Sequence, residues 1–202
     1  MANNLIGLDV GGTKTALIVG DDEGRVMQRH QFLTDPAGGF TGWLAQLEKL
    51  YQVMPEVDSP QAISVSIGGP LDIERGIIYS PPNLPGWDAI PLKETLQKRF
   101  GLPVFVEHDG NAGAIAEWRF GAGRGTRNMI FLTMGTGLGA GFILDKHVYR
   151  GSTDLAGEVG HMRIAEDGPK AYGKRGSWEG YCAGPAFARL AQQMYPQRWP
   201  QL

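Results

Sequence analysis

The sequence contains the same arrangement twice: an apolar run, a glycine-rich turn, and a second apolar run. The first copy is LIGLDVGGTKTALIVG at residues 5–20, and the second joins NMIFLTMG at 128–135 to LGAGFILD at 138–145. Short apolar runs on both sides of a glycine turn are typical of two strands joined by a hairpin. The repetition therefore predicts two similar halves, which we place at residues 1–121 and 122–202.

The residues between and after the two copies predict further helices and strands. Apolar residues at helical spacing, closing glycines and alanine-rich runs predict helices at residues 39–54, 92–101, 110–121 and 184–195. Short apolar or alternating runs predict strands at residues 25–34, 62–69, 76–80 and 103–109. Residues 151–183 are rich in glycine, and we expect an irregular segment there.

Composition excludes several classes of protein. Hydrophobic residues make up 42% of the 202 and charged residues 20%, which is ordinary for a globular chain. The formal net charge of -2 gives no general attraction to nucleic acids or acidic membranes. A single cysteine, Cys182, excludes an intrachain disulfide, and we expect a reducing cytoplasm. We recognise no signal peptide and no apolar run near the ~18 residues of a membrane-spanning helix.

The first glycine turn carries the residue types that bind phosphate. It is not a Walker A loop, because threonine stands where that motif needs lysine and no helix follows. We expect Gly11 and Gly12 to expose backbone N–H groups to phosphate oxygens. Thr13 adds a hydroxyl, Lys14 adds a cation, and Asp9 is the candidate ligand of Mg²⁺. The alternative interpretation is a glycine hairpin with a surface lysine.

The second turn offers a similar set in the other half of the chain. Gly135, Thr136 and Gly137 lie in MGTGLGAG, which is not GxGxxG and does not open a helix, so a Rossmann dinucleotide site is a poor match. One phosphate-type turn in each half indicates a nucleotide held between the halves.

Four stretches resemble a ROK-family sugar kinase of glucokinase type. They are LIGLDVGGTKTALIVG, EHDGNAGAIAE, TMGTGLGAGFILDKHVYRGSTDLAGEVGHM and GSWEGYCAG, and the resemblance runs from Leu5 to about Gly184. It implies the actin/Hsp70/sugar-kinase (ribonuclease H-like) fold, with two α/β domains around a central cleft. It further implies ATP, Mg²⁺ and a sugar as ligands, and a homodimer as the oligomer.

The resemblance assigns roles to individual residues. It makes Asp109 the catalytic base, whereas the residue types alone leave a helix N-cap equally open. It gives the sugar-contact positions as Gly69, Asn83, His108, Glu158, His161 and Glu179. Taken alone, Glu179 would be interpreted as a solvated or capping residue.

The sequence departs from the family in three places. His108 stands where the family often has asparagine, which bears on substrate choice. Many members bind zinc through one histidine and three cysteines, but Lys170, Tyr172 and Ser177 replace the cysteines here, and we expect no zinc. Family members continue well past Leu202, so the chain is either a fragment or a shortened member.

These observations predict an ATP-dependent hexose kinase that transfers the γ-phosphoryl group to a sugar hydroxyl. Glucose 6-OH is the first choice of acceptor, with mannose, fructose and N-acetylated hexosamines left open. One alternative is a truncated, inactive sugar-binding protein. Another is a sugar-responsive transcription repressor, but such repressors carry a helix-turn-helix before the kinase-like part, and here the first predicted strand begins at Leu5. We therefore expect no nucleic-acid partner.

Overall fold

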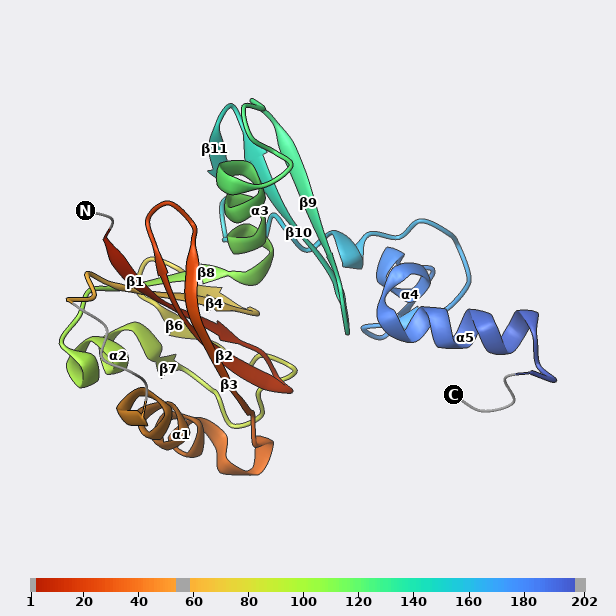
Figure 1. Cartoon of the computed structure of the whole chain (residues 1–202). Helices are drawn as coiled ribbons and strands as arrows, with labels where there is room; N and C mark the ends of the chain where they lie inside the picture. The colour runs from red at the N-terminus through yellow and green to blue at the C-terminus, as the bar shows by residue number, and fades with distance from the viewer. Residues whose placement is uncertain (1–2, 54–58, 199–202) are drawn as a thin grey trace. The chain divides into compact units, whose positions relative to one another are not determined.

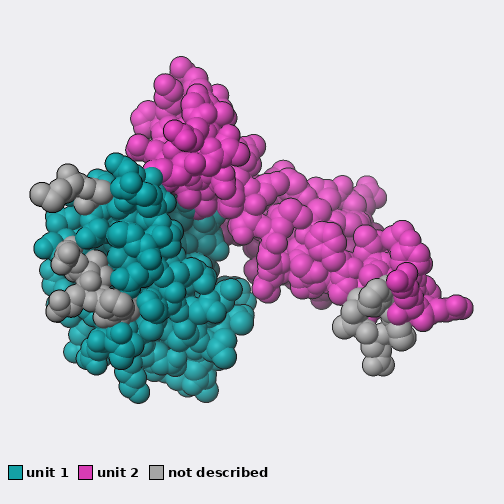
Figure 2. All heavy atoms as spheres, in the orientation of Figure 1, with its two compact units in different colours: residues 1–112 teal, residues 113–202 magenta. Residues whose placement is uncertain are grey.

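The computed structural model describes residues 3–53 and 59–198. The chain divides into two compact units, Met1–Ala112 and Gly113–Leu202, which Figure 2 shows in different colours. The division falls inside helix α3 (Asp109–Phe120) rather than after residue 121. The first turn of α3 continues directly from the preceding strand of unit 1, whereas Gly113 packs tightly against the ring of Phe131 in unit 2.

Unit 1 is built on a five-stranded sheet with the order β3-β2-β1-β4-β8 (Figure 1). Strands β1 to β3 form an antiparallel meander, while β4 and β8 run parallel to β1. The strand bounds are Asn4–Val10 (β1), Lys14–Asp21 (β2), Val26–Leu33 (β3), Ile63–Ile67 (β4) and Val104–His108 (β8). Because β1, β4 and β8 are parallel, their carboxyl ends lie at one edge of the sheet.

One face of this sheet carries the core of unit 1. Alternate apolar residues of β1, β4 and β8 pack with α1 (Gly39–Val53) and α2 (Leu92–Phe100), as period-two strands and amphipathic helices require. The rings of Trp43 and Trp87 are both buried and meet edge to face at 5.0 Å. The Trp43 indole N–H donates to the Thr15 hydroxyl at 2.8 Å, which satisfies its buried donor.

Three short strands and one 3-10 helix complete unit 1. The strands form a small antiparallel sheet with the order β5-β6-β7, and the 3-10 helix precedes α1. Their bounds are Leu71–Asp72 (β5), Ile77–Ile78 (β6), Ile90–Pro91 (β7) and Pro36–Gly38 (η1).

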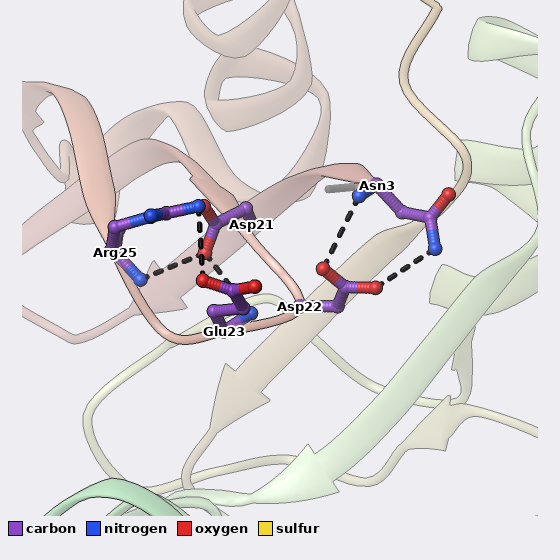
Figure 3. Close-up of polar contacts among 5 residues, drawn as sticks. All are labelled: Asn3, Asp21, Asp22, Glu23 and Arg25. Carbon is purple, nitrogen blue, oxygen red and sulfur yellow. Dashed lines mark hydrogen bonds and ion pairs between the residues drawn. The ribbon is translucent and has the colours of Figure 1, made fainter. Parts of the chain in front are cut away.

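The turn between β2 and β3 is held by charged side chains (Figure 3). The Asp21 carboxylate is nearly buried and accepts the backbone N–H groups of Glu23 and Arg25, each at 3.0 Å. The Arg25 guanidinium donates to the same carboxylate at 2.7 Å. The backbone and guanidinium N–H groups of Arg25 lower the pKa of Asp21, so this carboxylate stabilises the turn as an anion.

Unit 2 contains a second antiparallel meander, in the order β11-β10-β9. Its strands are Met129–Met134 (β9), Leu138–Leu144 (β10) and His147–Tyr149 (β11). Beyond it lie a 3-10 helix, a small hairpin and two helices. They are Val159–His161 (η2), Lys170–Ala171 (β12), Lys174–Arg175 (β13), Trp178–Cys182 (α4) and Gly184–Met194 (α5).

Both predicted strand–turn–strand units are confirmed, and each continues into a third antiparallel strand. The expectation of an irregular segment before residue 184 was wrong in part, because β12, β13 and α4 form there. Within residues 3–53 and 59–198, no helix has both the length and the apolar character needed to cross a membrane.

Candidate functional site

One group of candidate residues lies in unit 1, at the carboxyl edge of its sheet. Register pairs Val10 with Ile67, and Ile67 with His108, so β1, β4 and β8 end side by side. The predicted phosphate turn, the glycine pair Gly68–Gly69 and Asp109 follow these three strand ends. In open α/β sheets, ligands bind at the carboxyl ends of parallel strands.

Asp109 extends an exposed carboxylate from this edge, with 48% of its side chain accessible. One of its oxygens lies 2.9 Å from Nδ1 of His108 and accepts the Gly110 N–H at 2.7 Å. Burial works to raise the pKa of Asp109. The hydrogen bond and charge of His108 and the Gly110 N–H outweigh burial, so the pKa is lowered overall.

The hydrogen bonds of Asp109 do not follow the N-cap pattern. An N-cap side chain accepts from the backbone N–H two or three residues further on, whereas Asp109 accepts from the next residue. Glu107 fastens the start of α3 instead, because its carboxylate accepts the His108 N–H at 3.1 Å and the side-chain amide of buried Asn111 at 2.9 Å. The Asp109 carboxylate is itself held by its two chain neighbours, through Nδ1 of His108 and the N–H of Gly110.

The glycines after β4 lie beside His108, which ends β8, and Asp109, which begins α3. A Cβ on Gly69 would lie 3.0 Å from Nε2 of His108, and one on Gly68 would lie 4.0 Å from Oδ2 of Asp109. The structure therefore brings together three predicted site residues: Gly69, His108 and Asp109.

The first glycine turn is closed and braced from within unit 1. Gly11 donates its N–H to the carbonyl of Lys14 at 3.0 Å, so the expectation that this N–H is exposed to phosphate was wrong. Thr34 braces the turn, donating its hydroxyl to the Gly11 carbonyl at 2.8 Å and its N–H to the Thr13 carbonyl at 3.0 Å. The side chains of Asp9, Thr13 and Lys14 are exposed beside this turn.

The loop at residues 81–87 packs on the same turn. A Cβ on Gly12 would collide with the backbone carbonyl oxygen of Asn83, so the two segments approach as closely as a glycine permits. The side chain of Asn83 is exposed, while Leu84 and Trp87 of the same loop are buried in the core. The buried side chains of Leu84 and Trp87 therefore fix the loop to the core, and Asn83 lies next to the turn.

Unit 2 carries a second group of candidate residues, described by itself. Gly157 and Gly160 lie directly against the backbone carbonyls of Ala140 and Leu138, where any side chain would collide. The Ala140 N–H also donates to the Gly157 carbonyl at 2.8 Å. This close packing on β10 places Glu158 and His161 near each other, with Oε2 of Glu158 3.6 Å from Nε2 of His161.

Glu179 is buried at the start of α4 and reaches the turn between β9 and β10. Its Oε2 accepts the N–H of Leu138 at 2.9 Å and would lie 2.8 Å from a Cβ on Gly137. Ser177 caps the helix, accepting the Gly180 N–H at 3.3 Å. The structure thus gives Glu179 a partner in the turn rather than a solvated position.

Within the β9–β10 turn, Gly135 and Thr136 are exposed. The N–H of Gly135 donates to the Gly137 carbonyl at 3.0 Å, and its carbonyl accepts the N–H of Gly184 at 2.7 Å. The Gly135 N–H is thus already used within the turn. The exposed hydroxyl of Thr136 is the polar side chain that the turn offers to a phosphate.

Sequence reasoning missed one residue of this cluster, Tyr172. It lies between β12 and β13, and its ring is 4.4 Å from the ring of His161. No periodic pattern marks it, and it was considered only as a replaced cysteine. Among residues 3–53 and 59–198, no three His, Cys, Asp or Glu side chains are grouped so that they would hold a metal ion.

The chain resembles proteins of known activity over nearly its whole length. The sequence profile of the ROK family matches residues 5–201. The glucokinase of Streptomyces coelicolor is 39% identical over 190 residues, which are 93% of this chain and 59% of that protein. The xylose repressor of Bacillus spizizenii is 34% identical over 194 residues, covering 93% of this chain and 50% of the repressor. The chain therefore spans between half and three fifths of these relatives.

A solved structure supports the same assignment. The ROK family glucokinase from Streptomyces griseus, in complex with glucose and AMPPNP, superposes with a TM-score of 0.83 at 37% identity. The match covers 96% of this chain and 63% of that one. The fold is thus the actin/Hsp70/sugar-kinase type that the sequence predicted. From its profile, its relatives and its fold, the chain belongs to the ROK family.

Proposed function

We propose that the chain is an ATP-dependent hexose kinase that phosphorylates glucose on its 6-hydroxyl. The observation that carries the proposal is the ionised, exposed carboxylate of Asp109 at the end of β8, held by His108. The relatives add support, because the 39% identical protein is a glucokinase. As the chain spans 59% of that relative, its activity as a whole protein is part of the proposal.

In the proposed reaction, the sugar hydroxyl oxygen forms a bond to the γ-phosphorus while the bond from that phosphorus to the bridging oxygen of ADP breaks. The hydroxyl proton passes to the carboxylate of Asp109. A lowered pKa suits this task, because the hydroxyl becomes acidic only as its bond to phosphorus forms and the base must be ionised before that. Catalysis is then mostly a matter of positioning.

The first turn supplies groups that suit a phosphate chain and its metal. Thr13 and Lys14 would contact phosphate oxygens, and the exposed carboxylate of Asp9 would hold Mg²⁺ through water. When bound, the cation neutralises charge on the β- and γ-phosphates. The hydroxyl of Thr136 and the N–H of Gly12 and Gly137 complete the proposed phosphate contacts, whereas the N–H groups of Gly11 and Gly135 keep their turns closed.

Each unit has its own candidate sugar contacts. Glu158, His161 and Glu179 would bind vicinal hydroxyls in unit 2, and Asn83, His108 and the backbone at Gly69 would do so in unit 1. Carboxylates and imidazoles make the paired hydrogen bonds that a diol needs.

The test is release of ADP from MgATP with a panel of hexoses: glucose, mannose, fructose, N-acetylglucosamine and N-acetylmannosamine. We expect release that depends on the sugar and is fastest with glucose. Release that is the same with and without any sugar contradicts the proposal.

A second candidate function is sugar binding without phosphoryl transfer. The observation in its favour is the 34% identity with a xylose repressor over 93% of the chain. The carboxylates of Glu158 and Glu179 would bind a sugar whether or not transfer follows. Measured sugar binding together with no ADP release selects this function over the kinase.

A further inference from the structure

The hairpin of β12 and β13 places one aromatic side chain next to the sugar-binding candidates of unit 2. Tyr172 lies at its tip with a φ of 45°, a left-handed conformation that costs a bulky residue free energy. The Nζ of Lys174 donates to the His161 carbonyl at 2.9 Å and ties the hairpin to η2. Tyr172 and Gly173 both have a positive φ, as a two-residue hairpin turn requires, and the turn fixes where the tyrosine side chain starts.

The ring of Tyr172 faces His161. The two ring centroids are 4.4 Å apart and the planes are tilted by 37°, so the tyrosine covers one side of the imidazole. Nε2 of the same imidazole lies 3.6 Å from Oε2 of Glu158. Tyr172 therefore fixes the orientation of a residue that is already a sugar-contact candidate.

The hydroxyl of Tyr172 extends toward the carboxylates. It would lie 4.0 Å from a Cβ on Gly137, the same point that lies 2.8 Å from Oε2 of Glu179. Burial raises the pKa of Tyr172, and the charges of Glu179 and Glu158 raise it further, so the phenol keeps its proton. Within the described ranges, no hydrogen bond occupies this hydroxyl, and 55% of the residue is exposed.

The Tyr172 hydroxyl supplies a hydrogen-bond donor, which the carboxylates of Glu158 and Glu179 lack. A carboxylate only accepts hydrogen bonds, so the carboxylates of Glu158 and Glu179 bind the protons of sugar hydroxyls but leave the oxygens of those hydroxyls unpaired. A protonated phenol donates to such an oxygen. One sugar hydroxyl can then donate to a carboxylate and accept from Tyr172, with neither of its polar atoms left unsatisfied.

We propose that Tyr172 is a further sugar-binding residue, which donates its hydroxyl proton to a hydroxyl oxygen of the hexose beside Glu179 and so contributes to the choice of hexose. The inference rests on the proposed function, because it assumes that the ligand of this site is a hexose. It adds the one aromatic hydroxyl of the cluster to its two carboxylates and its imidazole.

The first experiment measures the equilibrium affinity for glucose by calorimetry. The variants are Tyr172→Phe and the matched control Tyr181→Phe, whose hydroxyl donates to the Asp167 carbonyl in the same unit. Loss of one hydrogen bond predicts that Tyr172→Phe weakens glucose binding about threefold to tenfold. We expect Tyr181→Phe to bind glucose like the parent chain. The same affinities are measured with glucose analogues that each lack one hydroxyl. For the analogue that lacks the hydroxyl bound by Tyr172, the parent and Tyr172→Phe should have equal affinities.

The second experiment uses the unaltered chain and acetylates exposed tyrosines with N-acetylimidazole. Saturating glucose should protect Tyr172 but not Tyr149, which is similarly exposed at 52%. If the parent binds glucose while Tyr172→Phe binds it equally well and Tyr172 gains no protection, the inference is wrong and the proposed function stands. If the parent binds no hexose, both are wrong.

Discussion

The buried carboxylate of Glu179 accepts the backbone N–H of Leu138 at 2.9 Å, which links α4 to the turn between β9 and β10. The turn can approach this closely only because residue 137 is glycine, since a Cβ there would lie 2.8 Å from the same oxygen. A sugar-contact candidate and a phosphate-contact candidate thus share one hydrogen-bonded structure. Changes at Glu179 are expected to reach the turn as well as the sugar.

Glu179→Gln separates the hydrogen bond to the turn from the proposed contact with the sugar. A glutamine can keep the hydrogen bond from Leu138 through its amide oxygen, so we expect a melting temperature close to that of the parent. The charge is lost, and a neutral acceptor binds a sugar hydroxyl less strongly, so affinity for glucose should fall about tenfold. Calorimetry measures the affinity, and Glu166→Gln, at an exposed position in the same unit, is the control. Equal affinity in parent and variant would remove Glu179 from the sugar site.

His108→Asn tests the electrostatics of the proposed base. Asp109 must be ionised to accept a proton, so activity is lost as the pH falls through its pKa. Although burial works to raise this pKa, the pairing with His108 lowers it, and removal of the imidazole should therefore raise it. We expect the acid limb of the pH profile of kcat/KM to move to higher pH in the variant. A limb that stays in place or moves to lower pH contradicts the pairing.

Gly12→Ala tests the close approach of the first turn to the 81–87 loop. The new Cβ would collide with the Asn83 carbonyl, and such overpacking typically costs about 1–3 kcal/mol of folding free energy. Denaturant unfolding measures the loss. The matched control is Gly42→Ala in α1, where a Cβ meets nothing within 4 Å and alanine is the better helix former, so stability should hold or rise. If both substitutions change the free energy of unfolding equally, the contact between Gly12 and the 81–87 loop leaves room for a side chain.

Asp21→Asn tests the charged turn of Figure 3. The backbone and side-chain N–H groups of Arg25 lower the pKa of Asp21 in the folded chain. Its contribution is therefore present above the unfolded pKa of about 3.9 and is lost as the pH falls through the folded value. We expect the variant to melt below the parent at pH 7, and the difference to shrink toward acid pH.

Asp22→Asn is the control for this change, because Asp22 is exposed and bonds only to Asn3 among the described residues. Its melting temperature should follow that of the parent across the same pH range. If the difference in melting temperature between the parent and Asp21→Asn does not change with pH, the negative charge of Asp21 does not stabilise the turn.

Much of the fold could be predicted because local signals decide it. The glycine turns at 11–12 and 135–137 lie between apolar runs, and both hairpins formed as expected. Gly101 ends α2 in the left-handed conformation that a closing glycine favours. The short strands β12 and β13 gave no such signal, because two residues are too few for any period to be recognised.

The candidate site could be proposed at Asp109 because a family motif surrounds that residue, and its role as the base stays a prediction. It was not predictable where the neighbours decide the role. The Gly11 N–H is used by the Lys14 carbonyl, which depends on how the turn closes. Tyr172 reaches His161 only because the hairpin of β12 and β13 folds back on η2, and that contact spans residues with no common pattern.

The most direct test of the kinase proposal compares phosphoryl transfer with sugar binding in Asp109→Asn. The measurement is transfer of radioactive phosphate from γ-labelled MgATP to glucose, alongside glucose affinity by calorimetry. Loss of a positioned base predicts transfer reduced about 10²- to 10⁴-fold with glucose affinity nearly unchanged. Asp145→Asn, at an exposed position paired with Arg127, should transfer phosphate like the parent. Undiminished transfer by Asp109→Asn, or no labelled sugar from the parent chain, would contradict the account.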